Sequence, residues 1–169
     1  MEPVQSSVSA SKKFNLLSRK RHYHTINPKA NNMTNNADKT CNDIVPKNIL
    51  NISASKHLTG HAIADVVEKD WQKVDPTTKA SFKNVGFDVD PTDISQTLTE
   101  IQQILTEQPW GGILLGWCLR GYAERTELFE QIVQLCVDEM KRMPTLPKLM
   151  FCTGPTNLAE ATLRNFSVE

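Results

Sequence analysis

The sequence predicts a small α/β domain with a mainly parallel sheet and helices on both of its faces. Two continuous apolar runs, residues 112–118 and 148–152, are typical of strands that are buried on both sides. An alternating run at residues 85–89 precedes them, and helical apolar stripes separate the three strands. Strands that alternate with helices in this way pair in parallel through right-handed crossovers. A three-layer architecture of the flavodoxin-like or Rossmann-like kind follows.

The helix after residues 85–89 carries a clear start signal. Asp90 is expected to be its cap and Pro91 to occupy its first helical position, with Asp93 near the positive end of the helix dipole. Pro109 ends this helix. Its apolar face consists of Ile94, Leu98, Ile101, Ile104 and Leu105.

The longest predicted helix lies between the two apolar strands. Its apolar stripe extends from Leu128 to Met143, and Pro144 ends it. After the strand at 148–152, Gly154 and Pro155 begin a last helix, which continues to Phe166.

The chain before Phe82 is expected to add to this regular core of residues 82–166. Residues 48–52 predict a short strand, and Thr59–Val74 predict a helix that packs on the core as a fourth layer piece. Residues 48–169 are therefore interpreted as a single domain. Whether the strand at 48–52 joins the sheet stays open at this point.

Residues 1–47 are interpreted as a disordered basic leader, because their polar composition offers no apolar pattern that could form a core. Residues 1–40 hold seven Lys and Arg against two acids, and the other 129 residues hold 12 basic and 17 acidic side chains. Residues 12–21 alternate basic and apolar side chains and resemble a mitochondrial presequence. An untargeted tail is the alternative, so the cytoplasm or the mitochondrial matrix is the expected location.

The acidic body argues against nucleic acid as a partner, because binding to phosphates requires a basic face. No apolar stretch is long enough to span a bilayer, so a soluble protein is expected. The spacing of Cys41, Cys118, Cys136 and Cys152 matches no zinc motif, and reduced buried thiols are the simplest interpretation. His57 and His61 have no third ligand nearby and are expected to face solvent. The sequence identifies no metal, no cofactor and no reaction.

Ligands of open parallel sheets bind at the carboxyl ends of the strands. The first of these ends carries Asp88. Arg120 and Gly121 follow the second strand, and Thr153, Gly154 and Asn157 follow the third. A guanidinium, a hydroxyl, two flexible glycines and the helix starts near Glu124 and Pro155 together suit a small anion such as a carboxylate or phosphate.

Other roles for these residues stay open. Arg120 would be structural if it paired with Glu124 or Asp88, and Thr153 would be structural if it only capped the last helix. Trp117 and Tyr122 either stack on a planar ligand or cover the core. A nucleophilic Cys118 or Cys152 is not expected, because every histidine precedes residue 62. The alternative function is a non-catalytic interaction domain, for example a homodimer formed through the Leu128–Met143 helix.

Two motifs carry a resemblance to a known family. The segment from Gly116 to Val133, together with the turn Phe151–Pro155, resembles small, largely uncharacterised α/β proteins of fungi and bacteria. The resemblance covers residues 82–166. It implies the fold and a shared site at the strand ends, but no reaction. The strand that this resemblance implies near residues 75–90 looks shortened in this chain.

Overall fold

The computed structural model describes residues 45–166, so most of the predicted leader and its presequence-like segment lie outside the described residues. None of the described helices is both long enough and apolar enough to cross a membrane. In chain order the elements are β1 (Lys47–Ser53), α1 (Ser55–Thr59), α2 (Ile63–Trp71), α3 (Pro76–Ala80), β2 (Phe82–Asp88), α4 (Ile94–Glu107), β3 (Gly112–Leu115), α5 (Trp117–Arg120), the 3₁₀ helix η1 (Ala123–Arg125), α6 (Thr126–Met140), β4 (Lys148–Phe151) and α7 (Leu158–Leu163).

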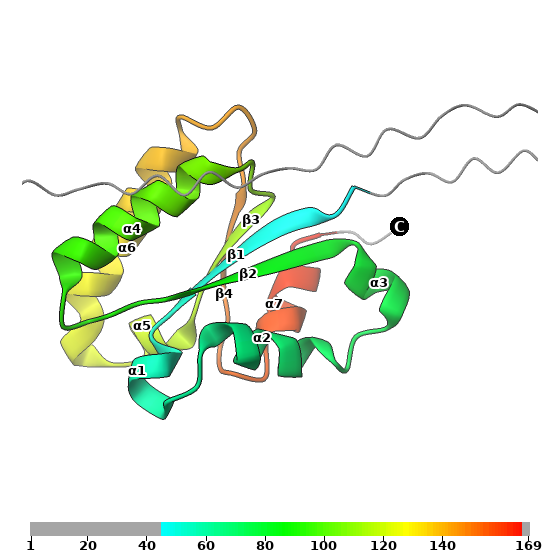
Figure 1. The fold of residues 1–169 in the computed structure, drawn as a ribbon, viewed down its shortest axis with the longest axis horizontal. Helices are drawn as coiled ribbons and strands as arrows, with labels where there is room; N and C mark the ends of the chain where they lie inside the picture. The colour runs from blue at the N-terminus through cyan, green and yellow to red at the C-terminus, as the bar shows by residue number, and fades with distance from the viewer. Residues whose placement is uncertain (1–44, 167–169) are drawn as a thin grey trace, which may run out of the picture. The chain divides into compact units, whose positions relative to one another are not determined.

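The four described strands form one sheet in the order β2-β1-β3-β4 (Figure 1). Every pairing is parallel. Leu50 of β1 lies opposite Val85 of β2 on one side and Ile113 of β3 on the other. β1 is therefore an inner strand, and all four strands end at the same edge of the sheet.

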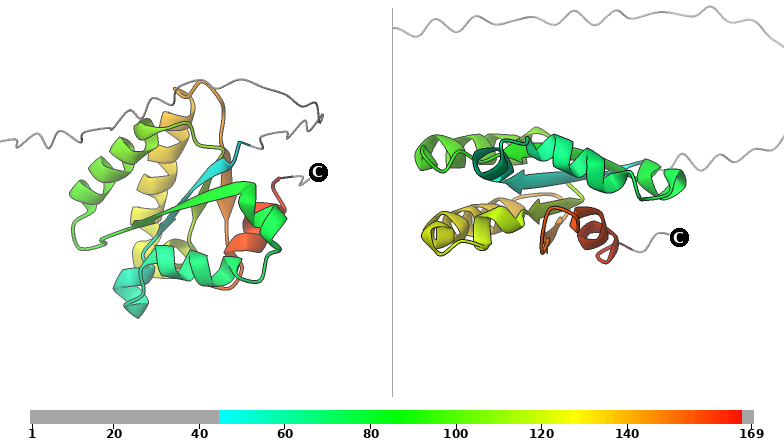
Figure 2. Two further views of the ribbon diagram at one scale, coloured as in Figure 1. Left: turned by 45° about the vertical axis from the view of Figure 1, so that its right-hand side comes forward. Right: turned by 90° about the horizontal axis from the view of Figure 1, so that it is seen from below.

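Helices cover both faces of the sheet. α4 and α6 lie on one face, and α2 and α7 lie on the other (Figures 1 and 2). This division follows from the strand order. The connection from β1 to β2 moves one way along the sheet, whereas the connection from β2 to β3 moves back past β1. Because parallel crossovers are right-handed, the reversal places α2 and α4 on opposite faces.

Successive side chains of β1 point to opposite faces of the sheet, so this strand contributes to both halves of the core. Leu50 and Ile52 belong to the cluster that α4 and α6 complete, and Ile49 belongs to the cluster that α2 and α7 complete. β3 does the same, with Leu114 in the second of these clusters. Since all four side chains are 0% exposed, the two inner strands are buried on both faces.

The prediction of a strand at residues 48–52 is confirmed, and this strand is central to the sheet. The sheet therefore has four strands where the regular core of residues 82–166 supplied three. β2 is seven residues long and pairs with β1 along its whole length, so the expectation of a shortened strand near residues 75–90 is wrong. The predicted position of the helix within Thr59–Val74 is also corrected. This helix, α2, packs beside α7 in a regular layer on one face of the sheet and is not a separate fourth piece of the layers.

Polar residues explain why β1 did not look central in the sequence. Asn51 is fully buried, in a position where an apolar side chain is the usual choice. Its amide nitrogen donates to Asn84 Oδ1 of β2 over 3.1 Å. The partner is 33 residues away in the chain, so no local pattern reveals that this amide nitrogen has a partner.

Several predicted boundaries are also corrected. The apolar run 112–118 is not one strand: β3 ends at Leu115, and α5 follows because Leu119 is itself buried in the core. Asp93 is the cap of α4, since its carboxylate accepts the Gln96 amide hydrogen over 3.0 Å. The predicted cap, Asp90, instead accepts hydrogen bonds from the amide and hydroxyl of Thr92.

Two predicted helices are shorter than expected. The stretch from Thr59 to Val74 divides into α1 and α2, because Gly60 ends α1 in the left-handed conformation with φ of 76°. The last helix begins at Leu158 and not at Pro155, so residues 152–157 form a loop at the carboxyl edge. This loop borders the candidate site.

Replacing Leu114 by alanine is expected to lower the free energy of unfolding by roughly 2–5 kcal/mol, because the side chain is fully buried between two strands and a helix layer. Chemical denaturation measures this change. Leu146→Ala is the matched control, since Leu146 is 75% exposed and should change stability little. Equal effects of the two substitutions would contradict the central position of β3.

Candidate functional site

The candidate site lies where the winding of the sheet reverses, at the carboxyl ends of β1 and β3. The chain leaves β1 toward the α2 face and leaves β3 toward the α6 face, so the two loops diverge. Ile52 O accepts the Gly116 amide hydrogen over 2.8 Å, and Ser53 O accepts that of Val89 over 2.8 Å. β1 is thus held on both sides up to its end, and the crevice opens directly beyond it.

A hollow of about 20 Å³ occupies this place and is called the switch-point hollow here. The loops after β1, β3 and β4 and the helices α2 and α7 contribute to it. Its volume suits one water-sized group. The residues that line it are Ser53, Ser55, Ile63, Val66, Gly116, Trp117, Cys118, Cys152, Gly154, Pro155 and Leu158.

Two buried serines, one at the end of β1 and one at the start of α1, line the switch-point hollow. Ser53 Oγ accepts the Ser55 amide hydrogen over 3.2 Å. Ser55 is only 5% exposed, and its hydroxyl has no hydrogen-bond partner among the described residues. Sequence reasoning missed both serines. Their place directly after the predicted strand at residues 48–52 is the one signal that pointed to them.

Arg120, the predicted cation, lies beside this hollow. It ends α5 and is exposed, and one guanidinium nitrogen donates to the carbonyl oxygen of Cys152 over 3.0 Å. In the described part of the chain it forms no ion pair with Glu124, Asp88 or any other carboxylate. Its other donors are therefore available to a ligand.

Asp88 lies apart from Arg120. It ends β2, on the other side of β1 from β3 and β4. Its carboxylate accepts the amide hydrogen of Ile63 over 2.9 Å and so satisfies the first turn of α2. The structure gives Asp88 this helix-starting role, and it is not brought together with Arg120.

A second hollow, of about 300 Å³, lies at the β2 end. Hydrogen bonds from the hydroxyl and the amide of Thr92 lower the pKa of Asp90 there, and the nearby His57 lowers it further. Basic and acidic side chains both line this hollow, so it has no concentrated positive charge that would attract an anion. It is lined by Lys56, His57, Asp88, Val89, Asp90 and Thr92.

Gly121 permits a close approach, and the group that approaches is the indole of Trp117. A Cβ atom at Gly121 would lie 2.6 Å from Trp117 Cε2. The same indole packs against Tyr122, with ring centroids 5.4 Å apart. Trp117 thus belongs both to the α5 turn and to the wall of the switch-point hollow.

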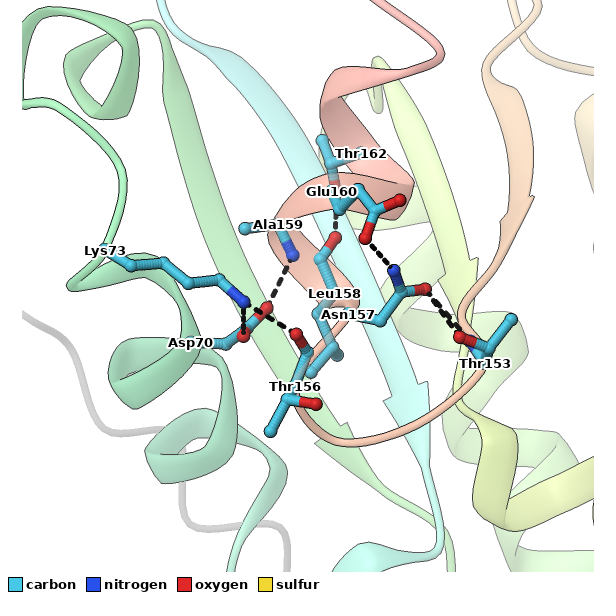
Figure 3. A network of polar contacts seen from close by, with 9 residues as sticks. All are labelled: Asp70, Lys73, Thr153, Thr156, Asn157, Leu158, Ala159, Glu160 and Thr162. Carbon is cyan, nitrogen blue, oxygen red and sulfur yellow. Dashed lines mark hydrogen bonds and ion pairs between the residues drawn. The ribbon is translucent and has the colours of Figure 1, made fainter.

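Thr153 and Asn157 close the loop after β4 (Figure 3). Asn157 Oδ1 accepts from the amide of Thr153 over 3.1 Å and from its hydroxyl over 3.0 Å. The Asn157 amide nitrogen donates in turn to Glu160. The hydroxyl that was predicted to contact an anion is therefore already bonded within the loop.

A buried carboxylate fixes the start of α7 against α2 (Figure 3). Asp70 accepts the Ala159 amide hydrogen over 2.8 Å and pairs with Lys73 over 2.6 Å. Lys73 also donates to the carbonyl oxygen of Thr156 over 2.6 Å. These contacts hold the loop that carries Gly154 and Pro155 along one side of the switch-point hollow.

The Cys152 thiol at the site is in surroundings that favour its neutral form. Burial raises the pKa of Cys152, although a hydrogen bond from the Trp117 amide to its sulfur, at 3.3 Å, acts in the opposite direction. Burial raises the pKa of Cys136, in the core, to about 12. No histidine lines the switch-point hollow, and within residues 45–166 no three His, Cys, Asp or Glu side chains form a metal-binding cluster.

No protein family, curated protein or solved structure matches the chain.

Adding one methyl group at Gly116 is expected to disturb the site, because the new Cβ would lie 2.5 Å from Ser53 Oγ and 2.7 Å from Ser53 Cβ. Gly116→Ala should lower the melting temperature clearly. Gly154→Ala is the control on the opposite side of the hollow, where no atom lies within 4 Å of the added Cβ. A Gly116→Ala variant as stable as Gly154→Ala would mean that β1 and β3 do not meet as closely as described.

Asp70→Ala is expected to destabilise the protein by roughly 1–3 kcal/mol, because it leaves the buried Ala159 amide without a partner. Urea denaturation should show the loss. Glu68→Ala is the matched control, since Glu68 lies on the same helix and pairs with Lys79 at the surface over 3.1 Å. Surface pairs of this kind contribute about 1 kcal/mol at most. If both variants lost the same stability, Asp70 would not anchor α7.

Proposed function

We propose that the domain binds a small anionic ligand beside the switch-point hollow, with Arg120 as the cation that attracts it. One observation carries the proposal. Arg120 is an exposed cation tied by a single hydrogen bond to the Cys152 carbonyl, and it has no carboxylate partner among the described residues. Because Cys152 itself lines the hollow, this bond holds the guanidinium beside it.

The chemistry of the guanidinium favours an anion with two or more oxygens. Its donors lie in one plane and match the oxygens of a carboxylate or a phosphate. The bond to the Cys152 carbonyl uses one of them and limits the motion of the long side chain. A cation that is positioned in advance loses less conformational entropy when a ligand binds.

The other predicted site residues support the site indirectly. Thr153 and Asn157 shape the loop, and Gly154 leaves space beside the hollow. Asp88 contributes by fixing α2, whose Ile63 forms part of the wall. In this proposal the anion contacts Arg120, and these residues set the shape of the place that receives it.

The alternative function, an interaction domain that dimerises through α6, has less support. The apolar stripe of α6 packs in the core, with Leu128, Ile132 and Cys136 all buried. Glu127, Glu130 and Gln134 are exposed on the same helix. A polar outer face with several acids is a poor surface for self-association.

The proposal also covers the family resemblance and the cellular location of the protein. The resemblance of residues 82–166 to small Rossmann-like proteins of fungi and bacteria is consistent with a ligand site at the strand ends. Cys118, Cys136 and Cys152 form no disulfide with one another, as expected for a reducing compartment such as the cytoplasm. The mitochondrial matrix is the alternative if residues 12–21 act as a presequence.

Arg120→Ala is expected to abolish ligand-induced stabilisation while leaving the melting temperature of the unliganded protein nearly unchanged. The measurement is a thermal-shift screen of the full chain with inorganic phosphate and small carboxylic acids. Arg164→Ala is the matched control, because Arg164 is also exposed and donates to the carbonyl oxygen of Phe151, the residue before Cys152. Equal losses of stabilisation in both variants would argue against a specific role for Arg120.

A further inference from the structure

We infer that the hollow between the ends of α4 and α6 is a second binding site, and that it takes a primary ammonium ion on a short apolar chain. The two helices pack side by side on one face of the sheet (Figures 1 and 2). They lead into the starts of β3 and β4, so this hollow lies at the opposite edge of the sheet from the switch-point hollow. It has a volume of about 460 Å³, is lined by Glu139 and residues 105–109 and 142–144, and is called the amino-edge hollow here.

α4 ends with carbonyl oxygens that lack their usual partners. The Leu105 carbonyl would accept from the residue four positions on, but that residue is Pro109, which has no amide hydrogen. The Glu107 carbonyl would accept from Gly111, whose amide instead donates to Asn48 O over 2.9 Å. Within the described part of the chain, α4 also has no basic side chain in its last turn. The end of α4 therefore adds hydrogen-bond acceptors and a partial negative charge to the wall of the amino-edge hollow.

A buried carboxylate of α6 adds a further acceptor. Glu139 is 5% exposed, and its Oε1 accepts from Gln102 Nε2 over 2.8 Å and from Arg142 Nη1 over 2.5 Å. Its Oε2 accepts no hydrogen bond from the described residues. This oxygen is also not sealed from solvent, as the unpaired oxygens Asn51 Oδ1 and Ser55 Oγ are. Because Glu139 lines the amino-edge hollow, its free oxygen is reached from there.

The charges in the wall favour a cation. Glu107 and Glu139 carry two negative charges, and Arg142 carries one positive charge. The guanidinium of Arg142 is already bonded to Glu139, whereas Glu107 forms no ion pair with a described residue. A primary ammonium group has three donors and no acceptor, so it matches a wall in which acceptors exceed donors. A charged donor on a carboxylate oxygen also forms the stronger kind of hydrogen bond.

The rest of the wall selects a cation with an apolar part. Leu105, Pro109, Met143 and Pro144 contribute apolar surface to the amino-edge hollow. A short alkyl chain is removed from water against these side chains, whereas a metal ion gains nothing from them. Among the described residues, no three His, Cys, Asp or Glu side chains are grouped as a metal site requires. The volume is within the range of about 300–1,000 Å³ that is usual for small-molecule sites.

Titration of the full chain with n-butylammonium, followed by the amide chemical shifts, tests the inference. The shift changes should saturate and should concentrate at residues 105–109 and 139–144. Butan-1-ol has the same chain without the charge, and tetramethylammonium has the charge without N–H donors. Both should bind about tenfold more weakly than n-butylammonium, or weaker still, because each lacks the charge-assisted hydrogen bond.

Two substitutions remove the negative charges separately. Glu139→Gln should weaken n-butylammonium binding about tenfold, while its amide oxygen can still accept from Gln102 and Arg142. Glu107→Gln should weaken binding about two- to fivefold, because this carboxylate is exposed. Glu100→Gln is the matched control and should leave binding unchanged, since Glu100 is exposed on the same helix but does not line the amino-edge hollow.

The inference and the proposed function fail separately, because they concern different edges of the sheet and opposite charges. Arg120→Ala should leave n-butylammonium binding unchanged. Butan-1-ol binding as tight as that of n-butylammonium would overturn the preference for a cation. Unchanged affinity in both Glu139→Gln and Glu107→Gln would overturn the site, and if Glu139→Gln does not fold, Glu107→Gln alone decides. The absence of any saturable shift change with n-butylammonium would also overturn it.

Discussion

The reversal of winding at β1 is the constraint on which the rest of the structure depends. β1 pairs with β2 on one side and β3 on the other, and the chain must pass it to go from one to the other. Right-handed crossovers then assign α2 to one face and α4 to the opposite face. Each face of β1 thereby becomes the floor of a separate core, with Leu50 in one and Ile49 in the other. The same reversal makes the loops after β1 and β3 diverge, and the switch-point hollow lies at the ends of these strands.

The sequence predicted the parts of the fold that depend on composition alone. β3 and β4 were identified because Leu114 and Met150 belong to continuous apolar runs. Only β3 is buried along its whole length, whereas β4 lies at the edge of the sheet and is partly exposed, so the expectation that residues 148–152 are buried on both faces is wrong. The central position of β1 could not be predicted in this way. The amide nitrogen of its buried residue Asn51 donates to Asn84, and that contact exists only once the two strands are paired. The cap of α4 was misplaced for a different reason, since Asp90 and Asp93 both precede the helix and local sequence does not rank them.

The candidate site was predictable to a similar degree. Arg120 was identified because it follows a strand that the sequence made clear, and the carboxyl ends of parallel strands are where ligands bind. Ser55 follows β1, whose place in the sheet was open, so nothing in the sequence placed it beside the end of β3. Ser55 and Trp117 line the same hollow as a consequence of strand order, because β1 and β3 are neighbours although β2 and α4 separate them in the chain.

Some polar groups at the carboxyl edge form hydrogen bonds that stabilise the fold, and others do not. Asp88 is used by the first turn of α2, Asp70 by the first turn of α7, and the hydroxyl of Thr153 by Asn157. Each of these bonds satisfies a backbone group or a turn that would otherwise lack a partner. Among the residues around the switch-point hollow, the hydroxyl of Ser55 and most of the donors of Arg120 are not used in this way. Because the described contacts use only one hydrogen bond of Arg120, the proposed function assigns the anion to this side chain.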